Sequence, residues 1–369
     1  MVFLPGTVSI SSLTIRIGTF PCLVTRQLSP QKEAEMISSV TGKPVAACPR
    51  RGRPALLAGG AAVALTILTT VSAAASPTVI STVPVGNAPL GVAVNPSTGA
   101  AYVANAGDST VSVISGLNRK VIATIGVGSA PHDVAANWVT DRIFVANVVS
   151  NTVSVINGRT NKVTATISVG TNPVGVAVDW ETNIIYVANF AGNTVSVING
   201  RTDTVSATIN VGTSTSAVAI NQETDTVYVA DDAANTVTVI NGRTNKITGT
   251  STVGNAPFEV AVNPETDTIY AANHDDNTVS AINGHNDKVT AVIPVGTSPF
   301  GVAVSPLTGN VYVANFGDNT VSVIRPRSDK VSAVIPVGTN PFGVAVSPLT
   351  GNVYVSNSGG NTVQVIPGD

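Results

Sequence analysis

The stretch IIYVANFAGNTVSVING, residues 184–200, decides the fold of this chain. Two short runs rich in β-branched residues, 184–189 and 194–198, enclose four turn-forming residues, and Asn199-Gly200 follows them. Runs of this length and composition predict strands, and Asn-Gly is a strong hairpin signal. A close relative of the stretch recurs every 42 residues, so it is one unit of an internal repeat.

Seven copies of this unit follow one another without insertion or deletion. The aromatic residue of the second run marks each copy, at Tyr102, Phe144, Tyr186, Tyr228, Tyr270, Tyr312 and Tyr354. Each copy contains four short β runs separated by turn residues, and four antiparallel strands in a period of about 40 residues are typical of propeller blades. The sequence therefore predicts an all-β, seven-bladed β-propeller with four-stranded antiparallel blades over residues 78–369.

The two ends of the repeat predict how the ring closes. Residues 77–86, PTVISTVPVG, have the sequence of a fourth strand with no copy in front of it. The chain stops at NTVQVIPGD, residues 361–369, which is a third strand with no fourth strand behind it. We expect the N-terminal strand to complete the last blade, because that arrangement joins the ends of the ring and removes an open edge.

Tyr-Val-Ala-Asn at 186–189, followed by Asn-Thr-Val-Ser-Val-Ile at 193–198, resembles the YVTN-type β-propeller repeat of secreted and surface proteins of bacteria and archaea. The resemblance covers all seven copies, with second-strand variants such as FVAN, YVAD, YAAN and YVSN. It implies a propeller fold. It is much less specific for function, because similar propellers serve as surface adhesins, scaffolds, nucleic-acid binders and lactonase-like enzymes.

The charge balance differs between the two parts of the chain. Residues 1–75 contain seven Lys or Arg against two Asp or Glu, whereas residues 76–369 contain twelve against nineteen. An acidic body is a poor match for a phosphate backbone, so we do not expect a nucleic-acid partner. Cys22 and Cys48 both precede the repeat. A cysteine-free body with a large core suits an oxidising compartment without disulfides, and we expect a monomer.

The N-terminal part has the layout of an export signal. Arg50 and Arg51 precede an uncharged apolar stretch, 54–77, which contains small residues around Ala75. Positive charge, then an apolar run, then small residues is typical of a secretory signal peptide, with cleavage expected near Ala75. We therefore interpret 1–53 as an N-terminal extension with the charged region of the signal, and 54–77 as its apolar and cleavage region.

Two questions about this signal stay open. A start at Met36 would give a signal peptide of ordinary length. An uncleaved signal anchor is the alternative to cleavage, since residues 55–75 are just long enough to span a membrane. In either case we expect the protein to be secreted or at the cell surface, with membrane contact only through such an anchor.

Function is expected where the copies differ, because the positions that repeat identically build the scaffold. At the start of the first strand, Asp133 in copy 2 and Glu259 in copy 5 occupy a position that Gly or Ala fills elsewhere, and His132 precedes Asp133. The fourth-to-first and second-to-third connections of a propeller share one face, which we call the top face. We expect these three side chains at the top mouth of the central channel, with the two carboxylates nearly opposite each other.

Further titratable residues fall in the second-to-third connections of the top face, namely Asp231, Asp232, His274, Asp275 and Asp276. Carboxylate oxygens are the ligands that Ca²⁺ prefers. The sequence thus suggests a top-face site for a cation or a basic ligand, with Asp133 and Glu259 as metal ligands and Ca²⁺ as the candidate ion. The alternative is a set of solvated loop acids, since no Asp-x-Asp-x-Asp run or other metal spacing occurs.

Aromatic residues mark two more places. Phe258, Phe300 and Phe342 form an apolar arc on the top face, which we interpret as a partner-binding patch; alternatively, each ring fills the gap between adjacent blades. Trp138 and Trp180 occupy equivalent positions on the opposite, bottom face of copies 2 and 3. This pair suits stacking on sugars, and local packing under the turns is the alternative.

These observations favour an exported propeller that binds or displays rather than catalyses, with a protein or a cell-envelope polymer as partner and no cofactor other than Ca²⁺. The runner-up is a lactonase-like or other hydrolytic propeller that uses Asp133 and Glu259 as acid and base. Single-stranded nucleic-acid binding is disfavoured by the acidic body and by the lack of a basic aromatic groove.

Overall fold

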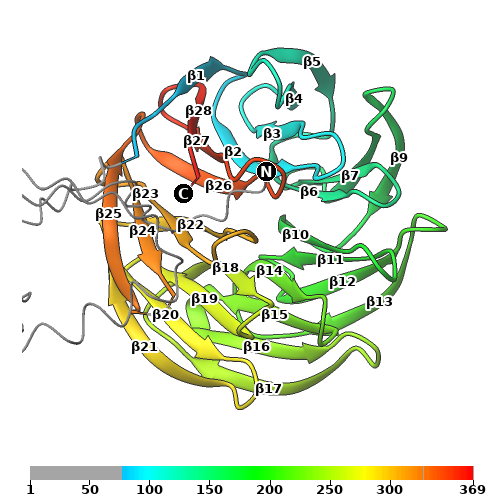
Figure 1. Cartoon of the computed structure of the whole chain (residues 1–369). Coiled ribbons are helices and arrows are strands. Elements are labelled where there is room, and N and C mark those ends of the chain that lie inside the picture. Colours follow the sequence, from blue (N-terminus) through cyan, green and yellow to red (C-terminus); the bar gives the residue numbers. More distant parts are fainter. Residues whose placement is uncertain (1–76, 327, 369) are drawn as a thin grey trace, which may run out of the picture. The chain divides into compact units, whose positions relative to one another are not determined.

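The computed structural model describes residues 77–326 and 328–368, which form a ring of seven β-sheets (Figure 1). Each sheet is one blade of four antiparallel strands, and the first strand of each blade lies at the centre of the ring. The predicted seven-bladed propeller is therefore confirmed. The predicted signal region lies outside the described residues, except for Pro77. No helix in the described part of the chain is long and apolar enough to cross a membrane.

The strands follow the repeat. Blades 1 and 2 consist of β2 (Pro89–Val94), β3 (Ala101–Asn105), β4 (Thr110–Ile114), β5 (Val121–Gly126), β6 (Pro131–Asn137), β7 (Arg142–Asn147), β8 (Thr152–Asn157) and β9 (Lys162–Ser168). Blades 3 and 4 consist of β10 (Pro173–Asp179), β11 (Ile184–Asn189), β12 (Thr194–Asn199), β13 (Thr204–Asn210), β14 (Thr215–Asn221), β15 (Thr226–Asp231), the short 3₁₀ helix η1 (Asp232–Ala234), β16 (Thr236–Asn241) and β17 (Lys246–Thr252). Blades 5 and 6 consist of β18 (Pro257–Asn263), β19 (Thr268–Asn273), β20 (Thr278–Asn283), β21 (Lys288–Pro294), β22 (Pro299–Val304), β23 (Val311–Asn315), β24 (Thr320–Arg325) and β25 (Lys330–Pro336). Blade 7 consists of β26 (Pro341–Val346), β27 (Val353–Asn357), β28 (Thr362–Ile366) and β1 (Ser81–Pro84).

The ring closes as the two ends of the repeat predict. β1, from the N-terminal side of the repeat, pairs antiparallel with β28, with Ser81 opposite Val365 and Pro84 opposite Thr362. The strand order of blade 7 is β26, β27, β28 and β1, so its outermost strand comes from the other end of the chain. This pairing covers the edge of β28, which would otherwise be free to pair with another chain.

The core lies between neighbouring blades. The second and third strands are buried on both faces because each blade stacks on the next, and this explains their continuous runs of Val, Ile, Ala and Tyr. Tyr102 of blade 1 packs with Ile143 of blade 2, and Tyr354 of blade 7 packs with Val103 of blade 1. The outer strands are largely exposed, which agrees with their alternation of Thr with apolar residues.

Two asparagines of the repeat hold the top of most blades, as blade 3 illustrates. Asn189, the last residue of β11, donates through Nδ2 to Thr194 Oγ1 at 3.1 Å and to Ser196 Oγ at 2.9 Å. Asn193 adopts a left-handed φ of 52°, which Asn tolerates better than most residues. Its Oδ1 accepts the N–H of Ser214 at 2.9 Å. The motif therefore recurs because it ties two strands and the next connection together.

One blade replaces a hydrogen bond with an ion pair. Tyr186 of blade 3 donates its hydroxyl to the carbonyl of Gly242 on blade 4 at 3.1 Å. In blade 2 the equivalent aromatic residue is Phe144, which has no hydroxyl. Arg142 donates instead to the corresponding carbonyl, that of Gly200, and forms a bidentate ion pair with Asp203 at 2.7 Å. This substitution joins blades 2 and 3 by a different pair of residues.

Candidate functional site

The innermost strands approach one another very closely at the top of the channel. A Cβ built on Gly175 of β10 would lie 2.8 Å from Cα of Ala217 on β14, closer than real Cβ contacts. This crowding explains why Gly or Ala fills the position in most copies. Asp133 occupies this position in β6, and Glu259 occupies it in β18. In both cases the equivalent residue of the following blade is a glycine, Gly175 or Gly301.

Asp133 is fixed by main-chain donors from two blades. Its Oδ1 accepts the N–H of Val134 at 2.8 Å, and its Oδ2 accepts the N–H of Val176 on β10 at 2.9 Å. Burial raises the pKa of Asp133 to about 6, although these two hydrogen bonds oppose the shift. The side chain therefore satisfies donors on two innermost strands while it retains a carboxylate that titrates close to neutral pH.

Glu259 faces the same space from blade 5. Its Oε1 accepts the N–H of Val260 at 3.3 Å. Burial and the negative charge of Asp133 raise the pKa of Glu259 well above its ordinary value. Two like charges that share a buried site are costly to ionise together, so the titration of each carboxyl group depends on the charge of the other.

His132 lies beside the two acids. Its Nδ1 is 2.8 Å from the carbonyl oxygen of Val174, which can only accept, so Nδ1 carries the proton. Burial lowers the pKa of His132, which keeps the imidazole neutral. The ring also meets Phe342 edge-on with centroids 5.4 Å apart and Phe258 at 6.1 Å. His132 thus links the carboxylates to the aromatic residues of the top face.

Three phenylalanines from blades 5, 6 and 7 pack against one another. Phe258 meets Phe300 edge-on at a centroid distance of 4.6 Å, and Phe300 stacks on Phe342 at 4.9 Å. Phe316, from the second-to-third connection of blade 6, adds a further edge contact to Phe300 at 5.1 Å. The rings therefore contact one another, and whether they bind a partner or fill the space between blades stays open. The rings form one half-buried aromatic cluster together with His132.

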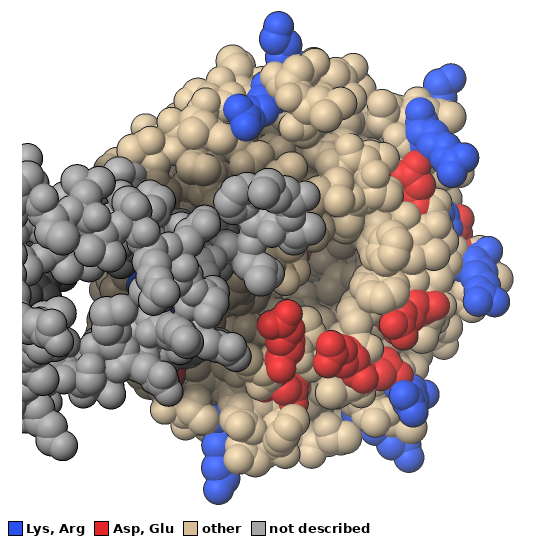
Figure 2. All heavy atoms as spheres, in the orientation of Figure 1, with Lys and Arg blue, Asp and Glu red and all other residues tan. Residues whose placement is uncertain are grey.

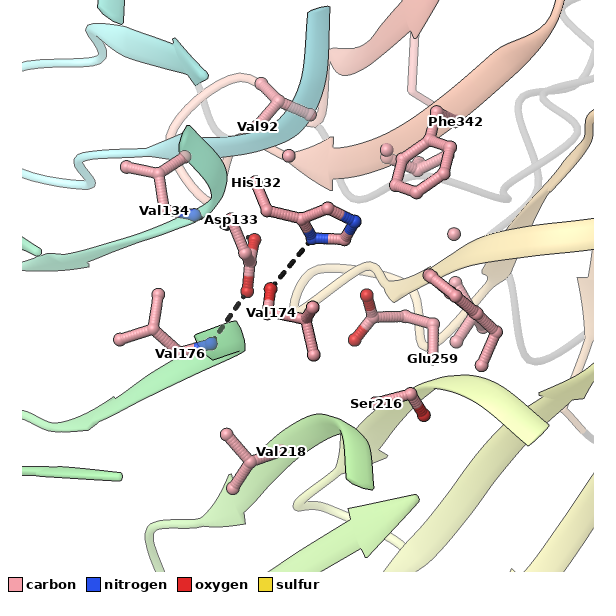
Figure 3. Close-up of a pocket in the computed structure, with 16 residues that line it drawn as sticks. Val92, His132, Asp133, Val134, Val174, Val176, Ser216, Val218, Glu259 and Phe342 are labelled. Atoms are coloured by element: carbon pink, nitrogen blue, oxygen red, sulfur yellow. Dashed lines mark hydrogen bonds between the residues drawn. The ribbon is translucent and has the colours of Figure 1, made fainter. Parts of the chain in front are cut away.

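Asp133, Glu259, His132, Phe258 and Phe342 line one cavity of about 150 Å³ at the centre of the ring (Figure 3). Figure 3 shows the two carboxyl groups directed into this space from different blades. Most of the exposed lining surface is polar, and valines at equivalent positions of six blades complete the wall: Val92, Val134, Val176, Val218, Val302 and Val344. The structure therefore brings together the channel-mouth acids, the histidine and two of the three phenylalanines that the sequence singled out.

Two of the predicted ligand residues have a structural role. Asp231 is not in a loop but ends β15, is fully buried, and accepts hydrogen bonds from Thr238 Oγ1 at 2.6 Å and Thr215 Oγ1 at 3.3 Å. It replaces the asparagine of the repeat. Asp276 accepts the backbone N–H of Asn255 at 2.7 Å and its Nδ2 at 2.8 Å. These carboxylates are engaged within the scaffold, and ligand binding by either of them stays a prediction.

The other loop residues lie on the rim of the aromatic cluster. His274 contacts Asp275 through Nδ1 and Oδ1 at 2.7 Å and lies against Phe300 with ring centroids 4.5 Å apart. Asp232, at the start of η1, is close enough for the charge of Asp275 to add to the burial that raises its pKa. Figure 2 shows the opposite, bottom face, where Asp and Glu side chains gather over blades 2 to 5 and Lys and Arg side chains stand at the outer edge.

The tryptophans of blades 2 and 3 form a contacting pair. The rings of Trp138 and Trp180 have centroids 5.2 Å apart and are tilted by 50°. Trp138 follows β6 and is 39% exposed. Sugar stacking at this pair remains a prediction, since mutual packing accounts for the contact as well.

The sequence pattern did not point to the main-chain part of the site. The N–H groups of Val134, Val176 and Val260 bind the carboxylates, and a backbone donor has no signal in the sequence. Ser216 also lines the cavity and donates to the carbonyl of Pro257 on the next blade at 3.0 Å. In the sequence, the one indication that Ser216 belongs to this site is its place directly before Ala217, which occupies the Gly/Ala position.

The described residues, 77–326 and 328–368, contain no group of three or more His, Cys, Asp or Glu side chains arranged to hold a metal ion. Asp133 and Glu259 provide two carboxylates to the cavity wall, whereas Ca²⁺ takes six to eight oxygen ligands. Calcium binding by this pair therefore stays a prediction, and it requires waters or a further ligand to complete the coordination.

Comparison with known proteins supports the fold. No protein-family model and no curated protein matches the chain. Among solved structures, hydrazine synthase of Kuenenia stuttgartiensis is similar, with a TM-score of 0.69 and 19% sequence identity over 76% of this chain and 95% of that one. At this identity the similarity concerns the fold alone: the chain is an all-β, seven-bladed propeller with four-stranded antiparallel blades and almost no helix.

Proposed function

We propose that this protein is an exported, non-enzymatic β-propeller that binds a ligand at the top mouth of its channel, as a member of the YVTN-type propellers that its repeat resembles. One observation carries the proposal. In blades 2 and 5, His132, Asp133 and Glu259 place titratable side chains where the other copies have uncharged ones, and all three line a single cavity together with Phe258 and Phe342.

Binding fits this arrangement better than catalysis. Both carboxylate oxygens of Asp133 accept hydrogen bonds from backbone N–H groups, and Nδ1 of His132 donates its proton to the carbonyl oxygen of Val174. Ser216 donates to main-chain carbonyls and has no hydrogen bond to His132, so these residues do not form a nucleophile and base in contact. Side chains fixed in this way form a preorganised surface, which favours recognition.

The test is a binding screen of the purified protein against cell-wall polymers, peptides, organic ions and Ca²⁺, read out as a rise in melting temperature. The matched variants are Glu259→Gln in the cavity and Glu223→Gln in an exposed connection of the bottom face. We expect a ligand whose stabilisation is lost in Glu259→Gln and kept in Glu223→Gln. A ligand that both variants bind as well as the parent would place the binding site elsewhere.

A second candidate function is hydrolysis of a small ester or lactone. The observation that favours it is a pair of buried carboxyl groups in one cavity, with the pKa of Asp133 raised to about 6 and that of Glu259 raised well above its ordinary value, because burial and a neighbouring like charge are how an enzyme tunes an acid and a base. Assays with γ- and δ-lactones between pH 5 and 9 test it. Turnover that Glu259→Gln abolishes would support this second function and overturn the non-enzymatic proposal.

A further inference from the structure

We propose that the ligand of the cavity is a small organic cation, an ammonium head group carrying methyl groups, and this inference rests on the binding function proposed above. The chemistry of the wall points to this class. Two carboxylates, three aromatic rings and a set of valine side chains surround one space, and none of the lining residues is Lys or Arg. Charge, aromatic faces and size each narrow the choice of ligand.

The charge of the cavity favours a cation. Asp133 and Glu259 are the acidic residues of the lining, and His132 is held in its neutral form. The hydrogen bonds of Asp133 and Glu259 within the cavity all come from uncharged backbone N–H groups. A bound cation would therefore supply the positive charge that the protein itself does not place next to these carboxylates.

The aromatic rings favour an organic cation over a metal ion. Phe258 and Phe342 line the cavity together with the imidazole of His132. The face of an aromatic ring attracts a cation, and cages of such rings bind quaternary ammonium groups. A metal ion would instead need a nearly complete shell of oxygen ligands, and the part of the chain that the structure describes brings no three His, Cys, Asp or Glu side chains together to hold one. Methyl groups, by contrast, pack well against valine and phenylalanine.

The volume limits the size of the group. The cavity of about 150 Å³ is comparable to one that holds benzene, and it is well below the range of about 300–1,000 Å³ typical of drug-sized ligands. A trimethylammonium group is within this limit. A longer ligand would extend from the mouth, past the rim where His274 and Asp275 lie beside Phe300. The acids of this rim, Asp232 and Asp275, would draw a cation toward the opening.

The experiment compares choline with its neutral isostere 3,3-dimethylbutan-1-ol by isothermal titration calorimetry of the exported protein at pH 7. We expect choline to bind at least about tenfold more tightly than the alcohol, because only choline carries the charge. Glu259→Gln should weaken choline binding by about tenfold or more. Phe342→Leu should also weaken choline binding, because leucine keeps an apolar side chain at this position but lacks the aromatic face. Glu223→Gln is the matched control and should leave the dissociation constant unchanged.

A second readout separates a charge effect from a loss of structure. Choline should favour the ionised form of Glu259, so binding by the parent protein should release protons, seen as a heat that changes with the ionisation enthalpy of the buffer. The Glu259→Gln variant should release fewer protons on binding choline, and its melting transition is measured first to show that it is folded. Equal binding of both probes would overturn the cation inference and keep the proposed binding site. Binding of neither probe would also overturn it, and the broader screen would then decide the proposed function separately.

Discussion

The carboxylate of Asp133 accepts the backbone N–H of Val176 on the neighbouring blade at 2.9 Å. The innermost strand of each blade has no further strand to pair with on its channel side. The N–H groups that face the channel therefore depend on side chains or water. Asp133 satisfies one such group on β10 and another on its own strand, that of Val134. In blades where Gly takes this position, no side chain can do so. An apparently irregular residue of the repeat is therefore part of the link between blades 2 and 3.

Replacing Asp133 by the Gly of the sister copies should destabilise the protein by about 1–2 kcal/mol. Two N–H groups lose their acceptor, which costs up to about 3 kcal/mol for buried groups, and the release of repulsion with Glu259 offsets part of this. Urea unfolding measures the change, with Glu259→Gln as the comparison, since Glu259 accepts a single bond of 3.3 Å. If Asp133→Gly were as stable as the parent, Asp133 would be a neutral substitution in a tolerant position.

The acid pair predicts that stability falls as the pH rises. Both folded-state pKa values are raised. The folded state therefore binds more protons than the unfolded state between pH 3.8 and about pH 6 through Asp133, and above the ordinary pKa of a glutamate through Glu259. The free energy of unfolding then decreases with pH over this window, by no more than about 3 kcal/mol for a shift of two units. Melting temperatures from pH 4 to 8 measure it. Glu259→Gln should flatten the curve relative to Glu223→Gln, and parallel curves would contradict the coupling.

The ion pair between Arg142 and Asp203 should contribute measurably to stability. It is bidentate and largely shielded, so we expect Arg142→Thr to cost about 2 kcal/mol. Arg159→Ala is the matched control, because Arg159 is 86% exposed and 3.6 Å from Asp141, and its loss should change stability by no more than about 0.5 kcal/mol.

A rescue variant tests why Arg142 is present. Adding Phe144→Tyr to Arg142→Thr rebuilds the arrangement of blade 3, where Tyr186 donates to the carbonyl of Gly242. The new hydroxyl should reach the carbonyl of Gly200 and recover about 1 kcal/mol in urea unfolding. Failure of Phe144→Tyr to improve on Arg142→Thr alone would show that the arginine does not replace this hydrogen bond.

Closure of the ring should be required for cooperative folding. Deleting residues 78–85 removes β1 and exposes the edge of β28, so we expect aggregation and loss of a single unfolding transition. Light scattering and thermal melting measure both effects. A protein that begins at Ser76 is the control and should melt like the exported form. A truncated protein with the same melting curve as this control would show that β1 is dispensable.

Residues 54–77 should direct export, with cleavage close to Ala75. These residues lie outside the described part of the structure, apart from Pro77, so the prediction rests on the sequence. Mass spectrometry of the secreted protein should find a mature N-terminus near Ser76. Full-length chain in the cytosol would contradict export, and uncleaved chain in the membrane would favour a signal anchor instead.

The sequence by itself determined the blade number, the strand order and the closure by β1. The physical reason is that each blade is a local unit: its strands are consecutive, its turns need Asn, Asp or Gly at fixed places, and a constant period leaves no other way to stack the units. Trp138 and Trp180 were also predictable as neighbours, because equivalent positions of adjacent blades lie side by side.

Only the tertiary structure decided how each irregular residue is buried and which partners it contacts. Asp231 and Asp275 look alike in the sequence, yet Asp231 is turned into the blade toward Thr238 and Asp275 stays on the rim. Asp133 and Glu259 share a cavity because the ring brings distant blades to one axis, and their raised pKa values follow from that burial and proximity. Such effects depend on what faces a side chain across the ring, and a local pattern carries no information about those partners.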